Sequence, residues 1–171
     1  MAGLDQVMEG AHRPGHFDGV ATVVARFLEI VKPHRAYFGK KDFQQLGIIR
    51  KVCQVKRLPV EIVAHPIERN SKGLALSSRN QLLSEERQNQ ALIIYNSLRW
   101  ARQNYHSHSP SQLKERIRQD FATSPLELEY VEISNSRNLQ PITGWDGTVH
   151  ARIFIAAKIA DIRLIDNLSL F

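Results

Sequence analysis

The stretch RAYFGKKDFQQLGIIRKVCQVKRLPVEIV, residues 35–63, decides the fold that this sequence predicts. Its first four residues favour a short strand that enters Gly39, and its last four, 60–63, favour a second strand closed by Pro66. The apolar residues between the strands recur at the spacing of one helical face: Leu46, Ile49, Val52 and Cys53. Strand, helix and strand in this order are typical of a parallel α/β layer, in which ligands collect where the strands end.

The residues before this stretch predict a further helix. Its apolar face consists of Val20, Val23, Val24, Phe27, Leu28 and Val31. Asp18 stands where an N-cap is expected, and Pro33 ends the helix. Two strands do not complete a parallel sheet, so we expect residues 1–76 to be the last part of an α/β domain.

The second half changes character and predicts a small α+β domain over residues 77–171. Ser84, followed by Glu85 and Glu86, marks a helix start. The apolar face of that helix continues through Ala91, Ile94, Tyr95, Leu98 and Ala101. Ser109-Pro110 opens another helix, whose apolar residues are Leu113, Ile117 and Phe121. Alternating apolar residues predict an antiparallel sheet: Leu126, Leu128 and Tyr130; then, after a Trp145-Asp146-Gly147 turn, Val149, Ala151, Ile153, Ile155 and Ala157; and finally 163–165.

The composition excludes several classes of protein. The chain has 171 residues, 43% of them hydrophobic, yet no apolar run is long enough to span a membrane and no charged start precedes an apolar secretory segment. We therefore expect a cytoplasmic protein with no membrane partner. The single cysteine, Cys53, cannot form an internal disulfide or a zinc site, and its apolar helical setting predicts a buried, inert thiol. His12 and His16 have the spacing of a helical metal-ligand pair, but Pro14 and Gly15 between them argue against a helix, and no spacing indicates a catalytic triad, so no metal site is predicted.

The net charge of +6 comes from one segment. Residues 32–57 hold eight basic residues against one acid, or +7, and the other residues hold fifteen basic and sixteen acidic ones, or −1. Either an anionic ligand binds this segment, or its charges lie on solvated helix faces.

Two clusters carry residue types suited to phosphate. Residues 38–45 lie where a strand gives way to a helix, so Gly39 allows close approach of a ligand and Lys40 and Lys41 supply charge. The alternative is a helix capped by Asp42 with solvated lysines. Residues 73–80 offer two adjacent hydroxyls, a guanidinium and a glycine hinge. The alternative there is a turn whose polar side chains bond their own backbone.

These clusters belong to a longer series of motifs that resembles one family. The series runs in chain order through Glu9-Gly10, Arg13-Pro14-Gly15-His16-Phe17, Gly19-Val20, residues 38–46, residues 73–80 and Ala160-Asp161-Ile162-Arg163-Leu164-Ile165-Asp166-Asn167. It is similar over essentially the whole chain to the pantothenate synthetase (pantoate–beta-alanine ligase) family.

The resemblance implies an α/β fold: the C-terminal part of a Rossmann-like nucleotidyltransferase domain that binds ATP and pantoate, followed by a small α+β lid domain with an antiparallel sheet. It implies a ligase of the coenzyme A pathway. Pantoate attacks the α-phosphorus of ATP, supplied with Mg²⁺, to give pantoyl adenylate and pyrophosphate, and beta-alanine then displaces AMP. No tightly bound cofactor is implied, and a homodimer is one expectation.

The resemblance also assigns roles to residues. ATP-binding residues are Gly39, Lys40, Lys41, Asp42, Glu68, Leu76, Ser77, Ser78 and Arg79, with Glu68 acting largely through its backbone. Gln45 aligns with a glutamine that binds pantoate. No residue is assigned as catalytic, because the family's H-x-G-H histidine pair has no counterpart in this sequence. We therefore expect the chain alone to be inactive.

Lys40 departs from the family pattern, which has an acid at this position. Two alternatives to the leading hypothesis stay open: another adenylate-forming enzyme of the same superfold, and a non-catalytic module that binds nucleic acid through residues 32–57. The second lacks the interleaved aromatic residues of a single-strand binder, so we expect small-molecule substrates and no nucleic acid.

Overall fold

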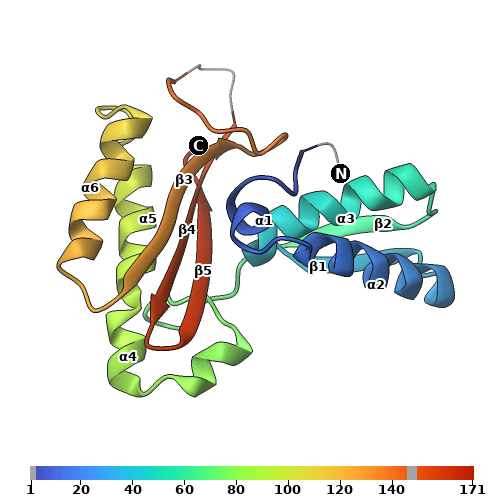
Figure 1. The fold of residues 1–171 in the computed structure, drawn as a ribbon, viewed down its shortest axis with the longest axis horizontal. Helices are drawn as coiled ribbons and strands as arrows, with labels where there is room; N and C mark the ends of the chain where they lie inside the picture. Colours follow the sequence, from blue (N-terminus) through green and yellow to red (C-terminus); the bar gives the residue numbers. More distant parts are fainter. Residues whose placement is uncertain (1–2, 146–149) are drawn as a thin grey trace. The chain divides into compact units, whose positions relative to one another are not determined.

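The computed structural model describes residues 3–145 and 150–171 and divides into two compact units, Met1–Ile67 and Glu68–Phe171 (Figure 1). The first unit contains, in chain order, α1 (Met8–His12), α2 (His16–Val31), β1 (Arg35–Gly39), the 3-10 helix η1 (Lys40–Asp42), α3 (Phe43–Lys56) and β2 (Glu61–His65). The second contains the 3-10 helix η2 (Ser78–Leu82), α4 (Glu85–Gln90), α5 (Leu92–Asn104), α6 (Pro110–Ala122), β3 (Glu127–Asn135), β4 (Ala151–Ile159) and β5 (Ile162–Ser169).

The first unit is built on a two-stranded parallel sheet. β1 and β2 pair in register from Arg35 opposite Glu61 to Gly39 opposite His65, so both strands end at the same edge. The cluster of buried residues beside the sheet is small: Leu28, Ile49 and Cys53, with partly buried neighbours such as Phe38 and Ile62. Burial raises the pKa of the Cys53 thiol, and the prediction of a buried cysteine is confirmed.

The second unit is a three-stranded antiparallel sheet, in the order β3-β4-β5, packed against helices. α5 contacts β4 and β5, and α6 contacts β3, as Figure 1 shows. Apolar residues from all five elements form one continuous core, which includes Leu98, Leu113, Ile133, Ile153 and Leu164. The predicted small antiparallel sheet covered by two helices is confirmed.

Three local features bear on the predicted helix starts. α2 begins at His16 after Gly15, whose left-handed backbone ends the preceding turn, so Asp18 lies in the first turn and is not the cap. The helix expected from Ser84 onward is two helices, because the Ile94 amide bonds back to the carbonyl of Ala91, three residues earlier, and interrupts the α-helical pattern. The Ser84 cap itself is confirmed, since its side chain accepts a hydrogen bond from the Arg87 amide.

The boundary between the units follows Ile67, whereas the sequence predicts it after residue 76. The segment between these points packs with the second unit because Arg69 pairs with Asp166 and Leu74 is buried in that unit's core. In the predicted turn after Trp145, Asp146, Gly147 and Val149 lie outside the described residues.

Candidate functional site

The first group of predicted site residues lies where β1 ends. Gly39 is the last residue of β1, and η1, made of Lys40, Lys41 and Asp42, follows at once. Both lysines are half-buried. Because Gly39 is paired with His65 at the end of β2, this group occupies the edge of the parallel sheet at which ligands of α/β folds collect.

The start of α3 continues this group along the chain. Asp42 occupies the cap position but its side chain makes no capping hydrogen bond, so capping does not explain this acid. Gln45 is half-buried in the first turn of α3, next to the Lys40–Asp42 group along the chain. The structure thus brings Gly39, η1 and Gln45 together in one unit.

Gln44, to which the 38–46 motif assigned no role, fixes this region to the start of the chain. Its buried side chain accepts a hydrogen bond from the Glu9 amide at 3.0 Å and donates to the carbonyls of Leu4 at 2.6 Å and Val7 at 2.8 Å. A buried amide that satisfies three backbone groups rigidifies its surroundings. No periodicity distinguishes Gln44 from Gln45, so the sequence offered no signal for this role.

The second group of predicted site residues lies in the second unit, at residues 68 and 76–79. Ser77 and Ser78 line a depression of about 460 Å³ together with Leu76, Asn80, Gln81 and Gln88. Leu76, Ser78 and Arg79 are exposed, and Ser77 is half-buried. Hydroxyls on the wall of an open depression, with a guanidinium adjacent in the chain, provide the donors that a phosphate group requires.

Glu68 stands at the base of the same segment. Its backbone carbonyl accepts a hydrogen bond from the Leu76 amide at 2.9 Å, so residues 68 and 76 face each other across a turn. The predicted ATP-binding residues therefore form two groups, one in each unit: Gly39 to Asp42 in the first, and Glu68 with Leu76 to Arg79 in the second.

Asn80 is a second residue to which the sequence motifs assigned no role. Its buried side chain donates to the carbonyl of Ala75 at 3.0 Å and accepts from the Ser77 hydroxyl at 2.7 Å. Gln88 in turn donates to the Asn80 carbonyl at 3.1 Å. Hydrogen bonds at both ends of the Ser77–Arg79 segment hold its backbone in a defined conformation.

The basic segment is less concentrated in space than in sequence. Lys56 bonds to Glu29 at 2.8 Å, and Arg35 bonds to Glu61 at 2.8 Å. Both acids lie outside residues 32–57, and folding brings them onto the segment, so they offset part of the +7 charge counted along the chain. This pairing reduces the positive surface that the segment offers to a nucleic acid.

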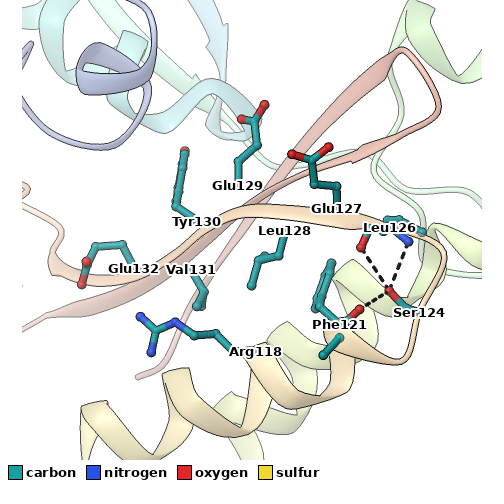
Figure 2. Close-up of a pocket in the computed structure, with 11 residues that line it drawn as sticks. Arg118, Phe121, Ser124, Leu126, Glu127, Leu128, Glu129, Tyr130, Val131 and Glu132 are labelled. Carbon is teal, nitrogen blue, oxygen red and sulfur yellow. Dashed lines mark hydrogen bonds between the residues drawn. The ribbon is translucent and has the colours of Figure 1, made fainter.

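A larger depression, of about 600 Å³, lies between α6 and β3 (Figure 2). Its lining includes Glu127, Glu129 and Glu132, with Arg118 from α6, and none of the predicted site residues. Burial alone raises the pKa of Glu129, but hydrogen bonds from Arg163 and Lys158 outweigh this effect and lower it. The acid-rich lining is unsuited to a phosphate ligand.

Within residues 3–145 and 150–171, no helix combines the length and the apolar character required to cross a membrane. The same residues contain no group of three or more histidine, cysteine and acidic side chains arranged to hold a metal ion.

The parallel strands, which end at the same edge of their sheet, place this chain in the α/β class of protein. A family model described as pantoate-beta-alanine ligase matches residues 1–169. The chain belongs to this family.

Relatives agree with that assignment. The chain is 46% identical over 168 residues to the pantothenate synthetase of Bacteroides fragilis, and 43% identical over 169 residues to that of Flavobacterium psychrophilum. Each match covers 98% of this chain and 60% of the relative, so the chain spans about 60% of the length of these relatives.

Two solved structures extend the comparison to the fold. The pantothenate synthetase of Thermus thermophilus matches with a TM-score of 0.91 and 39% identity, over 98% of this chain and 61% of that one. The pantoate-beta-alanine ligase of Francisella tularensis, complexed with beta-gamma ATP and beta-alanine, matches with a TM-score of 0.73 and 33% identity, over 98% of this chain and 55% of that one. The predicted fold class and family resemblance are confirmed.

Proposed function

We propose that this chain supplies the ATP-phosphate and pantoate contacts of a pantoate–beta-alanine ligase. The observation that carries the proposal is the family match over residues 1–169. The Francisella tularensis relative, solved with beta-gamma ATP and beta-alanine, supports ATP and beta-alanine as two of the substrates.

The proposed reaction joins two substrates at the expense of ATP, which enters with Mg²⁺. A carboxylate oxygen of pantoate attacks the α-phosphorus, the bond from that phosphorus to the bridging oxygen breaks, and pyrophosphate leaves with the electron pair. The amine of beta-alanine then attacks the acyl carbon of pantoyl adenylate. AMP leaves, the amine loses a proton, and pantothenate is formed.

The residues of this chain would stabilise the charge that develops on the phosphates of ATP and would orient pantoate. Negative charge grows on the departing pyrophosphate, and positioned cations and hydroxyl donors stabilise such charge. We assign this role to Lys41, Ser77, Ser78 and Arg79. Gln45 would hold pantoate, since its amide offers both a donor and an acceptor to a hydroxy acid.

The family's H-x-G-H histidines have no counterpart in this sequence. We therefore propose that the 171-residue chain alone does not complete the reaction. Joining it to the part of the Bacteroides fragilis enzyme that it does not match would supply the remaining contacts.

The test is pantothenate formation from pantoate, beta-alanine and ATP, followed by mass spectrometry, with the chain alone and with the joined protein. We expect product only from the joined protein. Lys41→Ala in the joined protein should lower kcat/KM for ATP by roughly a hundredfold. Lys51→Ala is the matched control, because it also removes one lysine charge from the basic segment, and Lys51 bonds to Gln54 on the exposed side of α3.

Each part of the proposal has its own contrary result. Product from the unjoined chain would refute the proposed inactivity. A joined protein that activates other carboxylates in place of pantoate would instead support a different adenylate-forming enzyme.

A further inference from the structure

The segment proposed to bind phosphate, Leu76–Arg79, follows a tight turn over residues 68–76. The Leu76 amide bonds to the Glu68 carbonyl at 2.9 Å, and the Asn70 amide bonds to the Leu74 carbonyl at 3.0 Å. The Asn70 side chain accepts two further bonds, from the amides of Lys72 at 3.1 Å and Leu74 at 2.9 Å. The turn is thus a defined structure that fixes where Leu76 begins.

Gly73 completes this turn in a conformation that other residues adopt with strain. Its φ is +102°, in the region that favours glycine, and a Cβ atom there would collide with the Tyr95 ring. Tyr95 in turn lies beneath the Arg69 guanidinium, whose centre is 4.1 Å from the ring centroid. The turn is therefore pressed against α5 with no room for a side chain at residue 73.

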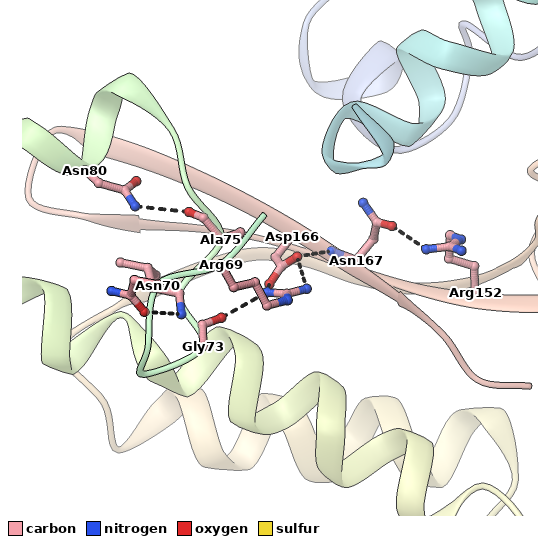
Figure 3. Close-up of polar contacts among 9 residues, drawn as sticks. Arg69, Asn70, Gly73, Ala75, Asn80, Arg152, Asp166 and Asn167 are labelled. Atoms are coloured by element: carbon pink, nitrogen blue, oxygen red, sulfur yellow. Dashed lines mark hydrogen bonds and ion pairs between the residues drawn. The ribbon is translucent and has the colours of Figure 1, made fainter. Parts of the chain in front are cut away.

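Arg69 connects this turn to β5, 97 residues further along the chain (Figure 3). One guanidinium nitrogen donates to the Gly73 carbonyl at 3.0 Å and to Asp166 Oδ2 at 2.6 Å, and the other donates to Asp166 Oδ1 at 2.9 Å. The two side chains are 15% and 4% exposed. A fork of this kind fixes direction as well as distance, which a single ammonium does not.

Asp166 is held from its other side as well. Its Oδ1 accepts a hydrogen bond from the Asn167 amide at 2.8 Å, and the Asn167 side chain accepts one from Arg152 at 2.6 Å (Figure 3). Burial lowers the pKa of Arg152 to about 10, while the nearby Asp166 charge acts in the opposite direction. The carboxylate is thereby anchored in the sheet, and the turn is anchored on the carboxylate.

We propose that Arg69 and Asp166 form a latch, and that they are positioning residues: they hold the turn against β5 so that Leu76, Ser77, Ser78 and Arg79 stand in the conformation that receives the phosphates of ATP. The latch touches no substrate and acts through the turn. This inference rests on the proposed function of the Leu76–Arg79 segment.

Amide hydrogen exchange of the 171-residue chain, without nucleotide, tests the latch on its own. In Arg69→Lys, which keeps the charge but loses the fork, exchange should accelerate at residues 73–80 while β3, β4 and β5 stay protected. Asp166→Asn should do the same more strongly. Acceleration across the whole second unit in both variants, or none at residues 73–80, would overturn the proposal in favour of a general structural role.

A nitrogen-15 NMR titration with Mg-ATP then tests the consequence for binding. We expect the apparent Kd for ATP to rise roughly tenfold in Arg69→Lys. Glu129→Gln is the matched control, because Glu129 and Arg163 form a carboxylate–guanidinium pair of the same 2.6 Å length and similar burial in the same sheet. Its Kd should equal that of the unchanged chain.

The two proposals fail in distinguishable ways. If the unchanged chain shows no ATP-dependent shifts at residues 76–79, the proposed function fails for this segment and the link from latch to nucleotide fails with it. If the unchanged chain binds and Arg69→Lys binds equally well, the latch alone is refuted. Should Asp166→Asn fail to fold, Arg69→Lys still decides, since it retains the positive charge beside Asp166.

Discussion

The two units of this chain differ in how much of their apolar surface they bury. The second unit encloses a continuous apolar core between its sheet and its helices. Among its described residues the first unit buries fewer apolar side chains: Met8, Phe17, Ala25, Leu28, Leu46, Ile48, Ile49 and Cys53. It also leaves large apolar side chains of α2 exposed: Val23 at 56%, Phe27 at 63%, Ile30 at 65% and Val31 at 63%. Because burial of apolar area is the main source of stability, the second unit should be the more stable of the two.

The site residues are divided along the same line. The Gly39–Asp42 group lies in the first unit, which has the smaller core. The Leu76–Arg79 group follows a turn that packs against the core of the second unit. The proposed phosphate contacts of the Leu76–Arg79 group are therefore supported by the larger apolar core of the second unit.

Truncation of an apolar side chain should produce the largest difference in stability loss between the two units. Ile153 is fully buried in the second unit, so Ile153→Ala should lower the free energy of unfolding of that unit by about 4 kcal/mol. Phe27→Ala removes an exposed side chain from α2 and should change stability by less than about 0.5 kcal/mol. Urea titration followed by circular dichroism measures both, and equal losses would contradict the contrast.

Two glycines provide the next test. Gly73→Ala should destabilise the second unit by about 3 kcal/mol, because it combines a strained φ with overlap against Tyr95. Gly19 lies in α2 with no heavy atom near its Cβ position, so Gly19→Ala should stabilise the first unit by about 1 kcal/mol. In thermal unfolding we expect the melting temperature to fall in Gly73→Ala and to rise in Gly19→Ala. A change in the same direction in both variants would contradict one of these two assignments.

The Glu129 ion pairs make the stability of the second unit depend on pH. The pKa of Glu129 lies below 4.5 in the folded chain, because hydrogen bonds from Arg163 and Lys158 outweigh burial. A carboxyl group whose pKa is lower in the folded than in the unfolded chain stabilises the fold at pH values above its unfolded-state pKa. This stabilisation is lost as the pH falls through the folded-state pKa. Glu129→Gln should therefore cost about 2 kcal/mol at pH 7 and progressively less below pH 4.5. A cost that is independent of pH would refute this account.

The smallest effect is expected at the surface of the first unit. Hydrogen bonding to Lys56 lowers the pKa of Glu29, yet the pair lies at the surface, where solvent reaches both side chains. Salt screens such pairs. Glu29→Gln should therefore shift the melting temperature only slightly at low ionic strength and not at all in high salt. A shift that persists in high salt would mean that the pair is shielded from solvent.

Local pattern was sufficient to predict much of the fold. The strands around Gly39 and Val63 and the capped start of α6 at Ser109 follow from apolar period and capping chemistry, which act over a few residues. The break at Ala91 has no sequence signal, because α4 (EERQNQ) holds only polar residues and the apolar face begins at Ala91 itself, so no apolar period marks where one helix ends and the next begins. The α2 start was missed because Gly15 reaches its position through a left-handed turn that no period records.

The candidate site was less accessible to sequence reasoning. The order of the motifs indicated residues 39–42 and 76–79. The side chains that hold these segments by hydrogen bonds pair with residues far away in the sequence. Asp166 is 97 residues from Arg69, and Gln44 is 40 residues from Leu4. Pairings at such separations depend on the finished fold, so no local pattern predicts them.

We propose that each unit carries its own contacts to the phosphates of ATP, and a nitrogen-15 NMR titration of the 171-residue chain with Mg-ATP tests this most directly. In the first unit we expect saturable shifts at the amides of residues 39–42 that weaken in Lys41→Ala. In the second unit we expect saturable shifts at residues 76–79 that weaken in Arg79→Ala. Amides that do not shift, or shifts that survive the substitution in their own unit unchanged, would contradict the assignment for that unit.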